Sequence, residues 1–424
     1  MQACLLLVAA STASAQMMAK PGHIGSGLSN AAWWQHAVFY QIQGGFKTDD
    51  SDFKAITARL DALKSLGVDA LLLPAPDLPA PGTNGNMPNF DDLDNLLRRA
   101  SAHGIRVLLT IHATSASQDL SGIARFWLSR GVAGLYIAAA PGTSPEDAQA
   151  TAQKLRKLAS TVAGQRIIIS DLGTANVAQS PRSRASRTSD ASAAQLQIDS
   201  RADRLPTLDA ASLRPLLAQT QQNLLLKLHA PNSLAEAVAA IAVIAHPTAL
   251  IDSSANLVLE PTPDHPEAAE QPAQPAPPMP PAPPPGTYLP YVPYTPSPKP
   301  RVAVAPKPAP IDPLTSWYRQ LVGLNHDNAV LRYGSKTLLD FDAQNALVWV
   351  NRPASESVHT PPVVVVCNLS SSPLQFSLAE AIKSLNLHGF FLRTLLRSDQ
   401  GMGAQDINAV TLPPFGVYIG ELRR

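Results

Sequence analysis

The sequence is poor in charge, in cysteine and in long apolar runs. Lys, Arg, Asp and Glu make up 15% of its 424 residues, and the formal net charge is +1. A near-neutral chain without a Lys/Arg-rich tract argues against nucleic acid or an anionic membrane as the main partner. No apolar run is long enough to span a bilayer. What remains is 45% hydrophobic residues, enough for ordinary globular cores.

Residues 1–15 have the pattern of a cleavable signal peptide. The apolar run Ala3–Ala10 precedes Ser-Thr-Ala-Ser-Ala, a small-x-small cleavage motif that ends at Ala15. The alternative interpretation is a frayed apolar N-terminus. We expect a secreted or periplasmic protein whose mature chain starts with a linker, residues 16–30. Cys4 lies within the leader, so Cys367 would remain alone as a small buried hydrophobe rather than a nucleophile.

Residues 31–252 show the alternation typical of a parallel α/β fold. Short apolar runs alternate with helical periodicity, as in the stripe Phe53, Ile56, Leu60 and Leu63, which predicts a helix. Eight βα units in roughly 220 residues match a TIM (β/α)8 barrel in number and size. The expected strands are Val38–Gln43, Val68–Leu73, Ile105–Ile111, Gly134–Ala138, Arg166–Ser170, Gln195–Ile198, Leu224–Leu228 and Thr248–Ile251.

A Pro-rich linker is predicted over residues 253–313. It contains 21 of the 40 prolines, all from Pro261 onward, and this density favours polyproline II over helix. The segment is either a stiff spacer or a docking strip around Tyr288, Tyr291 and Tyr294 for a protein partner. The spacer is preferred because such segments usually connect domains.

Residues 314–424 predict a C-terminal antiparallel β-sandwich. A helix-like stretch, Leu314–Leu324, comes first, and short apolar runs separated by turn signals follow it. The runs expected as strands are Thr337–Phe341, Ala346–Val350, Pro362–Cys367, Phe390–Leu396 and Val417–Ile419.

Several segments resemble, in the right order, glycoside hydrolase family 13, the α-amylase family. Trp33-Trp34 through Phe39-Tyr40-Gln41-Ile42 is similar to the family's first barrel strand. Later segments resemble the first helix with the second strand, the entry to the third strand, the helix before the fourth strand and the helix that opens the C-terminal β domain. These are Asp52–Ile56 with Leu60–Ala70, Asn89–Leu93 with His103–Leu109, Arg125–Gly134 and Trp317–Leu321. The resemblance implies a (β/α)8 barrel, a C-terminal β domain and an α-glucan or oligosaccharide as ligand.

The family's catalytic nucleophile is missing. In the family this residue is the Asp of a Gly-x-Arg-x-Asp run on the fourth strand. Here the run reads Gly134-Leu135-Tyr136-Ile137-Ala138, so Ala138 stands at the nucleophile position and Tyr136 at that of the arginine. Retaining glycosidases need two carboxyl groups about 5–5.5 Å apart, and a methyl group cannot form the covalent intermediate.

The other family positions are only partly retained. Asp171 stands where the family has its general acid, a Glu, so it is a candidate acid with a shorter side chain or else a turn cap. On the seventh strand His229 is kept, whereas Ala230 replaces the third acid. Tyr40, Tyr136 and His229 are candidate sugar-binding residues by resemblance, and His229 can equally be a packed or solvated histidine.

No cofactor or metal is predicted. The third-strand run has shrunk to Thr110-Ile111-His112, without the Asn that would bind calcium, and the chain is too short there for an inserted domain. Asp199 and Asp252, which follow the sixth and eighth strands, offer with Asp171 a conceivable new set of carboxylates.

Three functions remain open at this stage. The preferred one is a catalytically inactive member of the α-amylase family that acts in carbohydrate binding or protein association. The alternatives are a weak glycoside hydrolase that uses Asp171 as general acid, and a scaffold that presents the Pro-rich docking strip.

Overall fold

The computed structural model describes residues 32–42, 51–76, 89–113, 120–139, 145–171, 194–205, 207–218, 224–229, 231–260, 312–340, 345–353, 360–401 and 403–424. The predicted leader, the N-terminal linker 16–30 and residues 261–311 of the Pro-rich segment lie outside these ranges, as does Ala230. The expectations for them therefore stay predictions.

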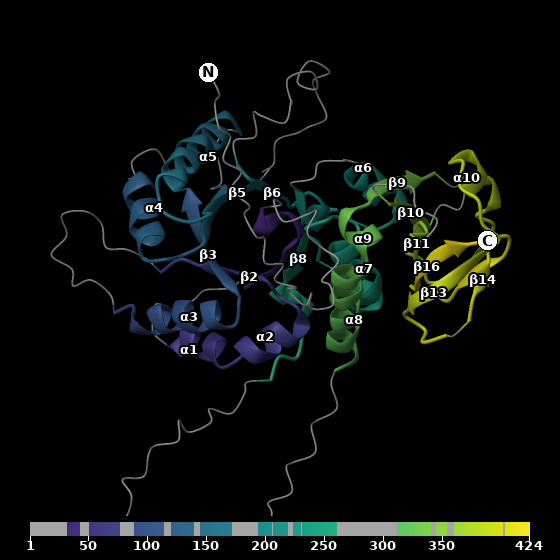
Figure 1. Ribbon diagram of the computed structural model, residues 1–424, viewed down its shortest axis with the longest axis horizontal. Helices are drawn as coiled ribbons and strands as arrows, with labels where there is room; N and C mark the ends of the chain where they lie inside the picture. The colour runs from purple at the N-terminus through teal and green to yellow at the C-terminus, as the bar shows by residue number, and fades with distance from the viewer. Residues whose placement is uncertain are drawn as a thin grey trace, which may run out of the picture.

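Eight parallel strands form the N-terminal sheet (Figure 1). Their order is β7-β6-β5-β4-β3-β2-β1-β8, and β7 also contacts β8, so the sheet nearly closes into a barrel. The strands are β1 (Val38–Gln41), β2 (Ala70–Pro74), β3 (Arg106–Ala113), β4 (Gly134–Ala139), β5 (Ile167–Asp171), β6 (Leu196–Asp199), β7 (Leu224–Leu226) and β8 (Ala249–Asp252). The (β/α)8 barrel is confirmed, with each strand shifted by at most a few residues from its predicted bounds.

Helices surround this sheet. Successive strand residues point to opposite sides, so each strand has one apolar face inside the barrel and another that the helices cover. Phe39, Leu108 and Ile169 belong to the cluster that fills the barrel, whereas their neighbours Val38 and Leu109 pack in the cluster under the helices. The helices are α1 (Ser51–Thr57), α2 (Leu60–Leu66), α3 (Asp91–Ala102), α4 (Leu120–Ser129), α5 (Pro145–Ser160), α6 (Ala210–Leu217) and α7 (Ala235–Ile244). Short 3-10 turns are η1 (Trp33–His36), η3 (Ala202–Arg204), η4 (Asn232–Leu234) and η5 (Ser253–Ala255).

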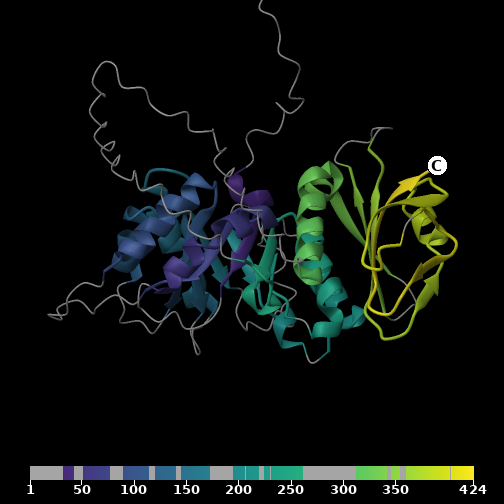
Figure 2. The same ribbon diagram turned by 90° about the horizontal axis from the view of Figure 1, so that it is seen from below.

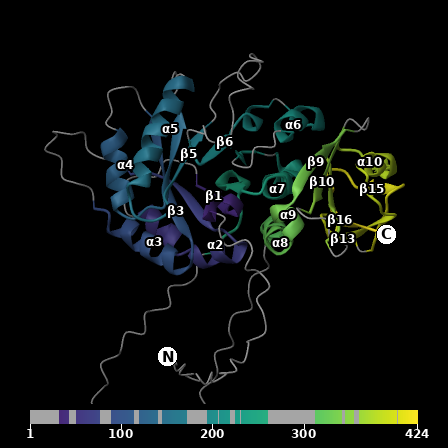
Figure 3. The same ribbon diagram turned by 45° about the horizontal axis from the view of Figure 1, so that its top comes forward.

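Two further helices lie between the barrel and the C-terminal sheets, α8 (Pro313–Asp327) and α9 (Ala329–Tyr333) (Figures 2 and 3). Helix α8 packs on α2 and α7, and the Trp317 indole donates a hydrogen bond to the Glu236 carbonyl at 3.0 Å. The helix expected at the start of the C-terminal domain thus completes the ring of barrel helices. Before the gap in the described chain, Val258 N donates to Thr315 Oγ1 at 3.0 Å, so Val258 lies against the first turn of α8.

The C-terminal region contains antiparallel sheets, as predicted. The larger one has the order β14-β13-β16-β11-β10-β9, and β12 pairs with β15. One face of the larger sheet, including Trp349 and Cys367, packs toward the barrel helices, and the other, including Val348 and Val366, packs under α10 and the small sheet. Burial raises the pKa of the Cys367 thiol, which agrees with a packing role. The elements are β9 (Ser335–Leu339), β10 (Ala346–Arg352), β11 (Val363–Asn368), β12 (Leu374–Phe376), α10 (Ala379–Ser384), β13 (Phe391–Arg397), β14 (Gln405–Asp406), β15 (Val410–Leu412) and β16 (Val417–Arg423).

Candidate functional site

The candidate site lies at the carboxyl ends of the barrel strands, where TIM-barrel proteins place their ligands. Residues two or four positions away from a barrel-filling side chain on the same strand point to the same side of the sheet. On β3 this places His112 in line with Leu108, and on β5 it places Asp171 in line with Ile169. On β4 the barrel-facing residues are Tyr136 and Ala138, both in contact with the interior cluster.

Ala138 occupies the end of β4 beside β3. Its Cα is paired with that of His112 on the neighbouring strand, and its methyl group packs against the barrel interior. The six residues of β4 are Gly-Leu-Tyr-Ile-Ala-Ala, so this strand carries no carboxylate. At this place the barrel offers a methyl group, which can neither attack a sugar nor ionise.

Asp171 is held by two hydroxyl groups. Tyr136 Oη donates to Asp171 Oδ2 at 3.3 Å, and Ser200 Oγ donates to Asp171 Oδ1 at 3.1 Å. Burial, together with the neighbouring Asp171 carboxylate and its hydrogen bond, raises the pKa of the Tyr136 phenol. Tyr136 therefore remains a neutral donor where the family has a permanent cation. The sequence singled out Tyr136 and Asp171 separately, and the structure joins them across β4 and β5.

Asp199 does not join Asp171. Its fully buried carboxylate accepts two hydrogen bonds from the Arg201 guanidinium, at 2.8 and 2.5 Å, and one from the Arg201 backbone N–H at 3.0 Å. The hydrogen bonds from Arg201 to Asp199 raise the pKa of the guanidinium. The pair is a closed structural unit at the end of β6, because each charge is satisfied by the other.

Asp252 ends β8 beside Gln41 of β1. Its Oδ1 accepts a hydrogen bond from Ser254 N at 2.8 Å, and Ser254 Oγ lies 3.0 Å from Nδ1 of His229. His229 is itself exposed. A polar chain thus connects the ends of β7 and β8, with the imidazole of His229 open to solvent and available to a ligand hydroxyl.

Ser200 and Ser254 were missed by sequence reasoning. Each serine follows the strand-end aspartate by one or two positions, and only the fold shows which carboxylate or imidazole it meets. Hydroxyl residues after strands are too common for their spacing to identify such contacts.

Tyr40 lies on the helix side of β1, apart from the barrel interior. It packs in the cluster under the helices with Val38, and Tyr318 of α8 is close enough for the charge states of the two phenols to interact. Burial, followed by the Asp252 carboxylate, raises the pKa of Tyr40 to about 12. This placement indicates a packing role for Tyr40 rather than contact with a sugar in the barrel mouth.

The raised pKa of Tyr40 predicts that the free energy of unfolding decreases at alkaline pH. The phenol ionises near pH 10 in the unfolded chain but near pH 12 in the folded one, so stability falls as the pH rises through this window. Tyr40→Phe should reduce the slope of unfolding free energy against pH by up to about 1.4 kcal/mol per unit. Urea titrations from pH 8 to 12 would measure it. A slope equal to that of the unsubstituted protein would contradict the assignment.

No metal site emerges in the ranges that the structure describes, since no three His, Cys, Asp or Glu side chains gather there in a suitable group. Within those same ranges, no helix combines the length and apolarity that a bilayer crossing requires.

Comparisons with known proteins identify the fold. No family model matches the chain. Isomaltulose synthase (PalI) from Klebsiella sp. LX3 superimposes with a TM-score of 0.59 at 13% identity, over 93% of this chain and 100% of that one. Trehalulose synthase MutB from Pseudomonas mesoacidophila MX-45 gives 0.58 at 16% identity, over the same shares. Both are α-amylase-family proteins, which confirms at the level of the fold the resemblance seen in the sequence.

A curated relative agrees with this assignment over a short stretch. Glucan 1,6-alpha-glucosidase from Streptococcus dysgalactiae subsp. equisimilis is 30% identical over 104 residues, which are 20% of this chain and 19% of that protein. The chain thus matches about a fifth of the length of this relative.

Proposed function

We propose that this chain, which has the fold of the α-amylase family, is a member of that family that binds α-glucans or related oligosaccharides without cleaving them. The observation that carries the proposal is the methyl side chain of Ala138 at the end of β4. Retaining hydrolysis requires a carboxylate nucleophile and a second carboxyl group as acid. The strand that should supply the nucleophile supplies none.

Asp171 and Asp199 do not replace the two carboxyl groups of a retaining glycosidase. Asp171 is bound by the Tyr136 and Ser200 hydroxyls, and Asp199 is committed to Arg201. A retaining mechanism needs two carboxyl groups that face one sugar, and these hydrogen bonds hold the two aspartates in separate clusters, Asp171 with hydroxyl groups and Asp199 with a guanidinium. These contacts favour structural and ligand-binding roles for the barrel-mouth carboxylates.

Sugar binding is the activity that the mouth can still perform. His112 and His229 are exposed, and Asp171 is half-buried beside two hydroxyl groups, so donors and acceptors for sugar hydroxyls remain. One similar solved structure is an inactive double mutant of MutB, with an aspartate replaced by alanine, in complex with isomaltulose, at 16% identity and a TM-score of 0.57. In that protein, inactivity and occupancy by a disaccharide coexist.

Calorimetric titration of the full chain with maltotriose and isomaltulose tests the proposal. We expect saturable binding of at least one sugar. The affinity should fall about tenfold in Asp171→Ala and in His229→Ala, because each substitution removes a polar contact to a sugar hydroxyl. His388→Ala, an exposed histidine in the C-terminal region, is the matched control and should bind normally. No saturable binding by the folded protein would overturn the proposal and leave protein association, through the Pro-rich segment, as the better hypothesis.

A further inference from the structure

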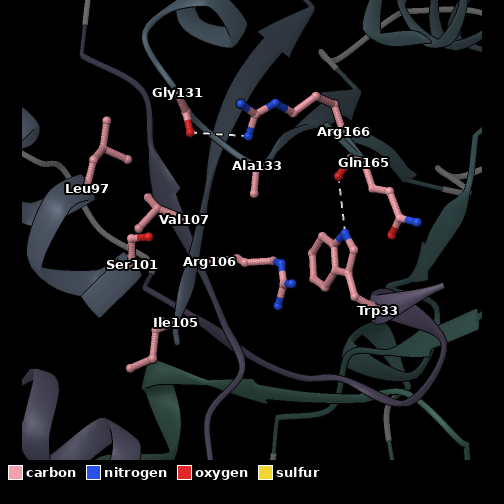
Figure 4. Close-up of a pocket in the computed structure, with 10 residues that line it drawn as sticks. All are labelled: Trp33, Leu97, Ser101, Ile105, Arg106, Val107, Gly131, Ala133, Gln165 and Arg166. Carbon is pink, nitrogen blue, oxygen red and sulfur yellow. Dashed lines mark hydrogen bonds between the residues drawn. The ribbon is translucent and has the colours of Figure 1, made fainter. Parts of the chain in front are cut away.

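A cavity lies at the end of the barrel opposite to Asp171, where the strands begin. It has a volume of about 410 Å³ and lies between η1, α3 and the starts of β3, β4 and β5 (Figure 4). Strand starts and strand ends form opposite faces of a parallel barrel, so this cavity is separate from the mouth around Asp171. Its size falls within the range of small-molecule sites.

The charged side chains that line this cavity are all positive. Arg106 and Arg166 are among the lining residues, and none of these residues is an aspartate or glutamate. Within the described residues neither guanidinium forms an ion pair, whereas Arg130, on the adjoining turn after α4, is paired with Asp94 at 2.6 Å. Two cations without a counter-charge at one cavity make it attractive to an anion.

Arg106 is positioned by stacking. Its guanidinium carbon lies 4.5 Å from the centre of the Trp33 ring, and the Trp33 indole is itself fixed by a hydrogen bond of 3.2 Å to the Gln165 carbonyl. Figure 4 shows the two side chains next to each other in the middle of the lining residues. Stacking uses the face of a guanidinium and leaves its N–H edge free, the edge that binds phosphate or carboxylate in a fork.

Arg166 lines the same cavity, beside Gly131 and Ala133 (Figure 4). Its Nη1 donates to the Gly131 carbonyl at 3.3 Å, which fixes the direction of the side chain, and its Nε is buried without a hydrogen-bond partner. A buried guanidinium N–H without an acceptor is unfavourable, and an anionic oxygen would satisfy it.

We infer that this cavity binds a small organic anion, with Arg106 and Arg166 sharing one phosphate or carboxylate group and Trp33 forming an apolar wall. The site does not depend on the sugar-binding proposal, because it shares no residue with the barrel mouth. Phosphate and carboxylate present the same oxygen chemistry to a guanidinium, so the test uses one probe of each kind.

The experiment is calorimetric titration of the full chain with inorganic phosphate and with citrate, at constant ionic strength. We expect one saturable site for at least one probe, weakened about tenfold in Arg106→Gln and in Arg166→Gln. Arg98→Gln is the matched control: it removes the same charge from the exposed face of α3, where Arg98 Nη2 donates a hydrogen bond to Asn95 Oδ1 at 3.0 Å, and should bind normally.

Arg106→Lys provides the second variant. It keeps the charge but loses the fork, and it should also weaken binding about fivefold or more. Circular dichroism confirms that each variant is folded. Absence of saturable binding of both probes, or equal weakening in Arg98→Gln, would overturn the inference.

Discussion

Gly134→Ala is expected to destabilise the barrel by about 3 kcal/mol, the upper end of the usual penalty for overpacking. Gly134 begins β4 and is paired in register with Ile167 of β5. A Cβ atom at Gly134 would lie 2.8 Å from Ile167 Cγ1 and closer still to the Ile167 carbonyl oxygen. Because the obstacle is partly backbone of a central strand, neither strand can move aside without disturbing its other neighbour.

Urea unfolding followed by circular dichroism would measure this effect. Gly323→Ala is the control, since a Cβ at this position in α8 meets nothing within 4 Å and alanine favours helix, so stability should rise slightly. Equal stability of Gly134→Ala and the unsubstituted protein would contradict the packing argument. Gly134 and Ala138 lie on the same strand, and this prediction concerns only the contribution of β4 to folding.

Hydrolysis of α-glucosides is expected to be no faster than in a blank without protein. Enzymes accelerate such reactions by factors on the order of 10⁶ or more, so even a poorly active glycosidase would stand well above the blank. The physical reason for this expectation is the methyl side chain of Ala138, at the position that the sequence resemblance assigns to the nucleophile, combined with an Asp171 carboxylate that accepts two hydroxyl hydrogen bonds.

Release of p-nitrophenol from its α-glucoside, and of glucose from maltotriose, measures the rate. Asp171→Asn provides the comparison: it keeps the size of the side chain and removes its acid. We expect the two proteins to be indistinguishable. A rate above the blank that disappears in Asp171→Asn would establish Asp171 as a working general acid and support the alternative of a weak hydrolase.

The barrel strands could be predicted because the chain alternates so regularly. A strand buried on both faces requires an apolar run such as Ile167-Ile168-Ile169, and eight such runs lead to one architecture. The stripe from Phe53 to Leu63 was interpreted as a single helix, but α1 ends at Thr57 and α2 begins at Leu60. Two helices in line can present one apolar face, so spacing alone does not reveal the break.

Elements in the C-terminal region were missed for a different reason. The strands β12, β14 and β15 have two or three residues each, and α10 has six. Segments this short carry no measurable period, and their conformation is set by the sheet on which they pack.

The sequence predicts which residue types stand at the strand ends of the candidate site, but not which side chains contact one another there. The position of Ala138 near the carboxyl end of β4 follows from the apolar run before it. Which side chains form hydrogen bonds with Asp171 depends on the direction in which the side chains at each strand end point. The packing of the barrel determines that direction. For Tyr40 a one-residue alternation decided the outcome, since Phe39 fills the barrel and Tyr40 meets α8.

The claim that no side chain of this protein becomes bonded to a sugar can be tested by trapping. Incubation with an activated fluorinated α-glucosyl fluoride, which forms long-lived adducts with retaining glycosidases, would be followed by intact-mass spectrometry. We predict an unchanged protein mass. A mass increase of one glycosyl unit, mapped by peptide analysis to an aspartate or glutamate, would contradict it.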